Sequence, residues 1–96
     1  MTSKHDDWLE VEQALGNKGR LRILRSLFAS RPLGLTRYRL SRETGLNQSE
    51  VKRNLEVLVR LRWVLEESLV PTTYVLNLEN RFVKKLGCFF EGLDLG

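Results

Sequence analysis

The spacing of the apolar residues changes along the chain, and this change limits the fold more than any other feature. Before Trp63 these residues recur at helical intervals, with capping residues ahead of the segments and glycines after two of them. From Trp63 the period changes, and 63–67 and 73–78 are predicted strands joined as a hairpin. Helical spacing returns over 79–93. The sequence therefore predicts a mainly α fold with a small β-hairpin and an additional C-terminal helix.

Capping residues and one glycine divide the middle of the chain into short helices. Thr36 can cap a helix that ends at Gly45, where glycine fits a left-handed turn because it has no Cβ. Asn47 opens the next helix, and Glu50, three residues on, is its capping-box partner. Two helices joined by so tight a turn predict a helix-turn-helix over 36–61.

The apolar stripes of these helices predict the core. The second helix, capped by Asn17, contributes Leu21, Leu24, Leu27 and Phe28, with Ile23 at the edge of the stripe. The helix after Gly45 contributes Val51, Leu55 and Leu58. Leu35 is expected to add a short strand.

Length and composition favour one small domain. The 96 residues fall well short of the size at which chains split, so we expect a single domain over 1–96 with a flexible tail at 1–6. No apolar run approaches the roughly 20 residues of a membrane span, and the polar, acidic start does not match a secretory signal. With one cysteine, no disulfide can hold the fold together. We expect an intracellular, cytoplasmic protein that does not bind membranes.

Side chains that enzymes commonly use are scarce. His5 is the only histidine, and Cys88, beside Phe89, is the only cysteine and is expected to act as a small buried hydrophobe. The common nucleotide-binding and metalloprotease motifs do not occur, and a zinc site would need about four clustered ligands. We therefore expect no enzyme activity, no metal and no cofactor.

The formal net charge of +4 hides a segregation of charge along the chain. Residues 1–16 carry a net −3 and residues 63–96 a net −2. Residues 17–62 carry twelve lysines and arginines against three glutamates, a net +9. A basic centre between acidic flanks indicates a face that binds a polyanion such as nucleic acid.

Three segments resemble a known family. Leu15–Leu24 is similar to the "LGNPTRLRIL" opening of ArsR-like repressors, and Thr44–Leu58 resembles their "LGLSQSTVSRHLKVL" turn and recognition helix. Tyr74–Leu76 resembles the family's second wing strand, and the layout also resembles small archaeal winged-helix regulators. The resemblance spans roughly residues 8–93 and implies a dimeric winged helix-turn-helix domain that binds double-stranded DNA.

In such a domain the recognition helix meets base edges in the major groove, and the preceding helix crosses the DNA backbone. Arginine and lysine can read guanine, and glutamine can read adenine. The candidate base-reading residues are Gln48, Ser49, Lys52 and Arg53, unless they form only a solvated helix face. The candidate phosphate contacts are Arg37, Arg39, Arg42, Lys18 and Arg20. Tyr38 is expected either to bind a phosphate or to lie half-buried in the core.

The chain departs from the family pattern at three places. The metal-site cysteines are absent, and their helix holds Arg39–Arg42, so we expect no thiolate metal sensor. Arg62 and Trp63 stand where the family has Gly-Leu, so the family pattern does not predict how the chain turns as it leaves the recognition helix. The wing at 63–78 has glutamates and no cation between Glu66 and Thr72, so we expect it to make weak contact or none with DNA.

The first and last helices, 8–15 and 79–93, are expected to form a homodimer. Their apolar side chains exceed the needs of a small core; they are Trp8, Val11, Phe82, Leu86, Phe89 and Phe90. Two recognition helices about 34 Å apart can read a palindrome. Alternatively, the last helix only covers the core of its own chain.

These features favour a sequence-specific, DNA-binding transcription regulator. One alternative is an architectural, chromatin-type DNA-binding protein with little sequence preference. Another is a winged helix used only for protein interaction, which the acidic wing favours and the basic centre disfavours. Binding to DNA would weaken steeply with salt, whereas an apolar protein interface would barely respond.

Overall fold

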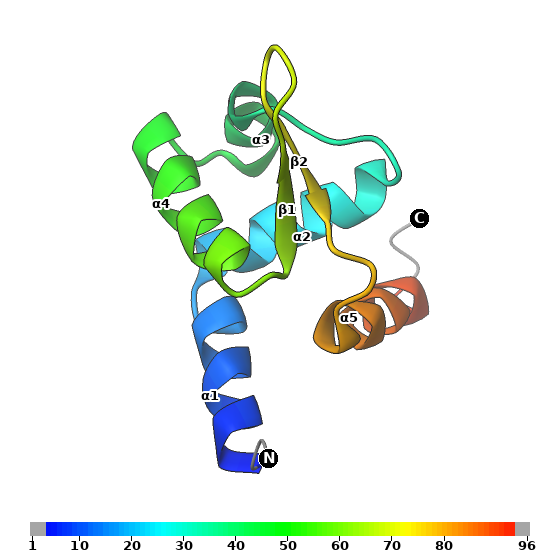
Figure 1. The fold of residues 1–96 in the computed structure, drawn as a ribbon. Helices are drawn as coiled ribbons and strands as arrows, with labels where there is room; N and C mark the ends of the chain where they lie inside the picture. The colour runs from blue at the N-terminus through cyan, green and yellow to red at the C-terminus, as the bar shows by residue number, and fades with distance from the viewer. Residues whose placement is uncertain (1–3, 94–96) are drawn as a thin grey trace.

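The computed structural model describes residues 4–93, which form helices around a small hairpin (Figure 1). The helices are α1 (Lys4–Leu15), α2 (Lys18–Ser30), α3 (Arg37–Thr44), α4 (Gln48–Arg60) and α5 (Arg81–Gly92), and the strands are β1 (Val64–Glu67) and β2 (Thr73–Leu76). The predicted fold class is confirmed. Helix α1 begins at Lys4, inside the segment 1–6 predicted to be a flexible tail, and Asp6 and Asp7 favour its positive N-terminal end. Residues 1–3 of that predicted tail lie outside the described residues.

The core lies where α2, α3 and α4 meet, and it is closed by the hairpin. Ile23, Leu24 and Leu27 of α2 are almost completely buried against Leu40 of α3 and the Val51, Leu55 and Leu58 stripe of α4. The prediction for Leu21 is wrong, because this side chain is 40% exposed, whereas Ile23, predicted at the edge, is fully buried. The face of α2 that meets the other helices is formed by residues 23, 24, 27 and 28, and Leu21 lies outside it.

The predicted caps fix the helix starts. The side chains of Asn17 and Thr36 accept hydrogen bonds from backbone N–H groups in the first turns of α2 and α3, each at 3.1 Å. Asn47 and Glu50 form the complete capping box, with bonds of 2.8 and 3.0 Å. Each cap satisfies a donor that has no partner within its own helix. The residues at which α2, α3 and α4 begin are therefore fixed by bonds within the first turn of each helix.

The hairpin is antiparallel, with Val64 opposite Leu76 and Glu67 opposite Thr73. Leu35 forms an isolated bridge with Tyr74, through bonds of 3.0 and 2.9 Å between their backbone groups. The predicted short strand at Leu35 is thus confirmed as a single bridge. The side chains of Val64, Tyr74 and Leu76 are buried, so one face of the hairpin covers the helical core.

Trp63 joins the terminal helices to the core. Its side chain is buried, its Nε1 donates to Glu10 Oε2 of α1 at 2.8 Å, and its rings stack on Phe82 of α5 with centroids 5.6 Å apart. An ion pair between Asp7 and Arg81 links α1 and α5 directly. The N-terminal end of α1 lies at the far side of the molecule from α3 and the tip of the hairpin (Figure 1).

Helix α5 covers the core of its own chain, which is the alternative interpretation of the last helix. Val83 and Phe90 are buried, and the Phe90 ring packs edge-on against Phe28 with centroids 5.3 Å apart. The prediction that Phe90 belongs to a dimer interface is therefore wrong, because this side chain is 4% exposed and occupied within the chain. The prediction that Cys88 is buried is also wrong, since this residue is exposed.

Candidate nucleic-acid interface

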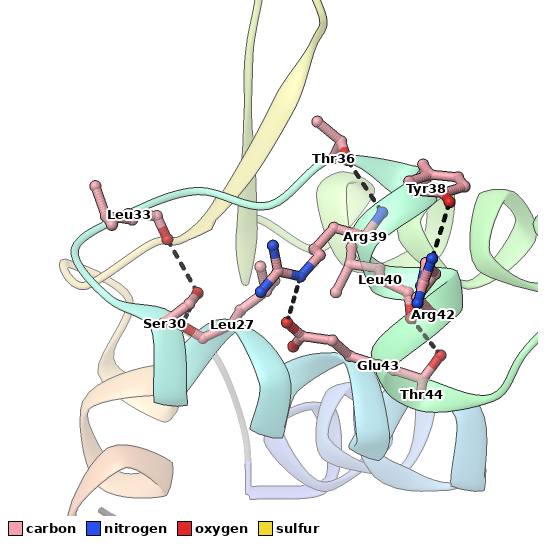
Figure 2. Close-up of polar contacts among 10 residues, drawn as sticks. All are labelled: Leu27, Ser30, Leu33, Thr36, Tyr38, Arg39, Leu40, Arg42, Glu43 and Thr44. Atoms are coloured by element: carbon pink, nitrogen blue, oxygen red, sulfur yellow. Dashed lines mark hydrogen bonds and ion pairs between the residues drawn. The ribbon is translucent and has the colours of Figure 1, made fainter.

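The turn between α3 and α4 is held by side chains as well as by glycine. Gly45 has φ of 79°, a conformation that costs a residue with a Cβ about 1 kcal/mol or more. The Thr44 hydroxyl donates to Leu40 O at 2.6 Å and accepts from Leu46 N at 3.2 Å, and the first of these bonds is drawn in Figure 2. The Ser41 hydroxyl donates to Leu46 O at 2.6 Å. The predicted tight turn is therefore confirmed, and it fixes the start of α4 relative to α3.

Helix α4 presents the predicted base-reading residues to solvent. Its buried face comprises Val51, Asn54, Leu55 and Leu58. Gln48, Ser49, Lys52 and Arg53 are all exposed and share the opposite face. At about 100° per residue these four positions span an arc of roughly 140° within the first two turns. The structure thus brings the four donors together directly after the fixed turn.

Two exposed residues on this face, Glu56 and Arg60, were not among the sequence-predicted site residues. Glu56 is exposed and follows Lys52 by four positions and Arg53 by three, so it continues the same surface. The helical spacing alone would have placed it there. Its carboxylate gives the face an acceptor beside the cations.

The surface of α3 carries the predicted phosphate-binding side chains. Arg37, Tyr38, Arg39 and Arg42 are all exposed. The half-buried alternative for Tyr38 is wrong, because the residue is 61% exposed. Arg42 Nη1 donates to the Tyr38 hydroxyl oxygen at 3.1 Å, so the phenolic proton stays available, and Arg39 Nε pairs with Glu43 at 2.8 Å (Figure 2).

Arg20 does not lie with the exposed cations. Its Nε donates to Gln13 O at 2.7 Å and its Nη1 to Asn54 Oδ1 at 3.1 Å, so it ties α1 and α2 to α4. Burial, followed by the nearby charge of Arg60, lowers the pKa of its guanidinium. Helical spacing places Arg20 on the core side of α2, four positions before Leu24, whereas Lys18 is exposed at the first position of the helix.

The wing is acidic, as the sequence predicted, and its tip is apolar. Glu66 accepts a bond from the Tyr74 hydroxyl at 3.2 Å, and Glu67 accepts one from the Thr73 hydroxyl at 3.0 Å. Burial and then the charge of Glu66 raise the pKa of Tyr74. At the tip, Leu69 and Val70 are exposed. An open groove separates this wing from α4 and is lined by Arg37, Lys52, Glu56, Arg60 and Glu66, among others.

Two further features of the described residues bear on the site. Over residues 4–93 there is no group of three or more His, Cys, Asp or Glu side chains that could hold a metal ion. Within the same part of the chain, every helix is too short or too polar to cross a membrane.

Helices α2, α3 and α4 with the β1–β2 hairpin form a winged helix-turn-helix fold. A solved structure with this fold is that of a MarR family transcriptional regulator from Silicibacter pomeroyi. The two chains are 28% identical, with a TM-score of 0.65 over 95% of this chain and 63% of the other. This chain thus spans less than two thirds of that regulator's length. No model of a known protein family matches the chain, and neither does any curated protein.

Proposed function

We propose that this chain is a transcription regulator that binds double-stranded DNA through α4. The main support is the exposed face of α4. Four side chains that can donate hydrogen bonds project from its first two turns, directly after a turn fixed by Gly45, Thr44 and Ser41. The likeness to a MarR family transcriptional regulator supports it, as does the ArsR-like resemblance of Leu15–Leu24 and Thr44–Leu58. The proposed role is binding, without catalysis.

In this account the start of α4 enters the major groove, which is about 12 Å wide and admits a helix. Gln48, Lys52 and Arg53 then reach the base edges. Arginine or lysine pairs with guanine O6 and N7, and glutamine pairs with adenine. The side chains of Arg37, Tyr38 and Arg42 on α3 contact phosphates and set the register of the protein on the duplex.

We also propose that the protein acts as a homodimer through α1 and α5. Trp8 on α1 and Phe89 on α5 are 59% and 60% exposed, so the core of the single chain leaves both side chains uncovered. Val11, Phe82 and Leu86 are half-buried and would border the interface. A two-fold dimer would pair two α4 helices with an inverted repeat in the DNA.

A second candidate function is a protein-interaction module that uses the wing. The exposed Leu69 and Val70 lie next to an acidic strand, a surface that suits a basic and apolar protein better than phosphates. If this function were the main one, the chain would not bind duplex DNA even at low salt.

The proposal is tested by selection from a library of random DNA duplexes, performed with the full chain. We expect enrichment of an inverted repeat, because a dimer with a sequence-reading α4 requires one. Recovery of DNA without enrichment would contradict sequence reading and favour the architectural alternative. Absence of binding at low salt would contradict DNA binding itself.

A further inference from the structure

Outside the helix-turn-helix, a second strongly basic surface lies on α2. Lys18, Arg22 and Arg25 recur at i, i+4 and i+7, so they lie above one another on the outer face of the helix, and all three are exposed. Helix α2 contains no aspartate or glutamate. Its opposite face buries Ile23 and Leu24. We call Lys18, Arg22 and Arg25 the α2 stripe.

The carboxylates beside the α2 stripe are already engaged. Glu50 lines the hollow that it shares with Lys18 and Arg22, but its Oε1 accepts the Asn47 N–H of the capping box at 3.0 Å. Glu43 lines a second hollow, with Arg22 and Arg25, and pairs with Arg39 at 2.8 Å. In the part of the chain that the structure describes, none of the three stripe side chains forms an ion pair, so the stripe can bind an external anion.

The α2 stripe is held in a fixed place relative to α4. Arg53 of α4 lines the same hollow as Lys18 and Arg22, so the stripe continues the basic face of the recognition helix. The bond from Arg20 to Asn54 ties the two helices together, and Gly19 allows their close approach, since a Cβ there would lie 2.8 Å from the Asn54 amide.

The stripe and the wing flank α4 on opposite sides. The hollow beside α2 is lined on α4 by Arg53, Asn54 and Val57. The groove beside the wing is lined on α4 by Lys52, Glu56 and Arg60, among others. On one side α4 borders the basic α2 stripe, and on the other side it borders the acidic wing.

We propose that the α2 stripe binds the phosphate backbone of the duplex that flanks the bases read by α4, on the side away from the wing. This inference rests on the proposed DNA binding, and it adds the position of the flanking duplex relative to the protein. A row of cations at helical spacing neutralises successive phosphates, whereas Glu66 and Glu67 repel them. On the wing side, cations come only from α3 and α4, as Arg37, Lys52 and Arg60, and the β1–β2 hairpin adds none.

The test compares two double variants of the full chain that each remove two exposed cations. Arg22→Gln with Arg25→Gln alters the stripe, and Lys84→Gln with Lys85→Gln, shown by sedimentation to dimerise like the wild type, is the matched control on α5. Affinity for the selected duplex is measured against salt concentration. We expect the stripe variant to lower the slope of log affinity against log salt by about 2 for each chain bound, since each phosphate contact contributes about 0.9, and the control to leave the slope unchanged.

Equal slopes in the wild type and the stripe variant would overturn the inference and assign these cations to another acidic partner. An equal decrease in both variants would overturn it too, because the effect would then come from net charge. Failure of the wild type to bind any duplex is a different result and contradicts the proposed function. Because Arg22 Nη1 also donates to Thr44 O at 3.3 Å, Arg25→Gln alone serves as a second variant, with an expected decrease in slope of about 1 for each chain bound.

Discussion

Arg62 is the one residue other than glycine with a positive φ among residues 4–93, at 66°. Its carbonyl accepts bonds from the Asn77 and Asn80 side chains at 2.8 and 3.1 Å, and its N–H donates to Val59 O at 3.0 Å. These bonds hold a left-handed conformation that costs an ordinary residue about 1 kcal/mol or more. The chain therefore leaves α4 through a glycine-like turn without having a glycine there.

We expect Arg62→Gly to leave the free energy of unfolding unchanged or to raise it by up to about 1 kcal/mol. The strain is relieved, and the greater freedom of glycine in the unfolded chain offsets part of the gain. Urea unfolding measures the effect. Glu56→Gly, inside α4, is the control and should lower stability by about 1 kcal/mol. An equal loss in both variants would show that Arg62 is not strained.

The Tyr74 phenol is buried beside Glu66, and both features raise its pKa above the ordinary value of 10.0. The neutral form is thus favoured in the folded state. The stabilisation is fully present below pH 10 and is lost as the pH rises through the folded pKa. We expect the free energy of unfolding to fall more steeply above about pH 10 in the wild type than in Tyr74→Phe. Parallel pH curves for the two proteins would contradict this.

At Arg53 the prediction concerns base recognition. Arg53→Ala should weaken binding to the selected duplex by about 1–3 kcal/mol and binding to scrambled DNA by less, because a base contact is lost. Arg37→Ala, at a proposed phosphate contact on α3, should weaken binding to both duplexes about equally. Fluorescence anisotropy with both duplexes measures the difference. If Arg53→Ala also weakens both equally, Arg53 contacts phosphate and does not read a base.

At the scale of the helices and strands, local chemistry made the order and the starts of the elements predictable. Asn17, Thr36 and Asn47 cap their helices as predicted, because a cap depends on residues only three positions away. Packing between elements was less predictable. Helical spacing alone could not show that Ile23 would replace Leu21 in the core, or that Phe90 would pack on Phe28.

Helix α5 has a buried face and an exposed face. Variants of two neighbouring phenylalanines, one on each face, distinguish the effect on stability from the effect on self-association. Phe90→Ala should lower the free energy of unfolding by about 3–5 kcal/mol, because it leaves a cavity beside Phe28. Phe89→Asp should change stability by less than about 1 kcal/mol and weaken self-association, since Phe89 is exposed. Thermal unfolding and sedimentation measure the two effects. A Phe89→Asp protein that dimerises like the wild type would place the interface elsewhere.

At the scale of the whole molecule, the segregation of charge along the sequence corresponds to a segregation in space. The exposed cations of α3 and α4 lie on the helix-turn-helix, and the acidic residues of β1 lie on the wing. The sequence predicted both surfaces because exposed charges follow from helix and strand periodicity. It could not predict that Arg20 would bond to Asn54, since that contact joins residues 34 positions apart.

The most direct test of the central claim, that α4 reads base sequence, is a salt titration of binding to the selected duplex and to its scrambled counterpart. The account predicts affinity that falls steeply with salt for both, and a preference for the selected duplex of about a thousandfold or more near physiological salt. Equal affinity for the two duplexes would contradict sequence reading by α4. Affinity that does not respond to salt would contradict binding through the basic face.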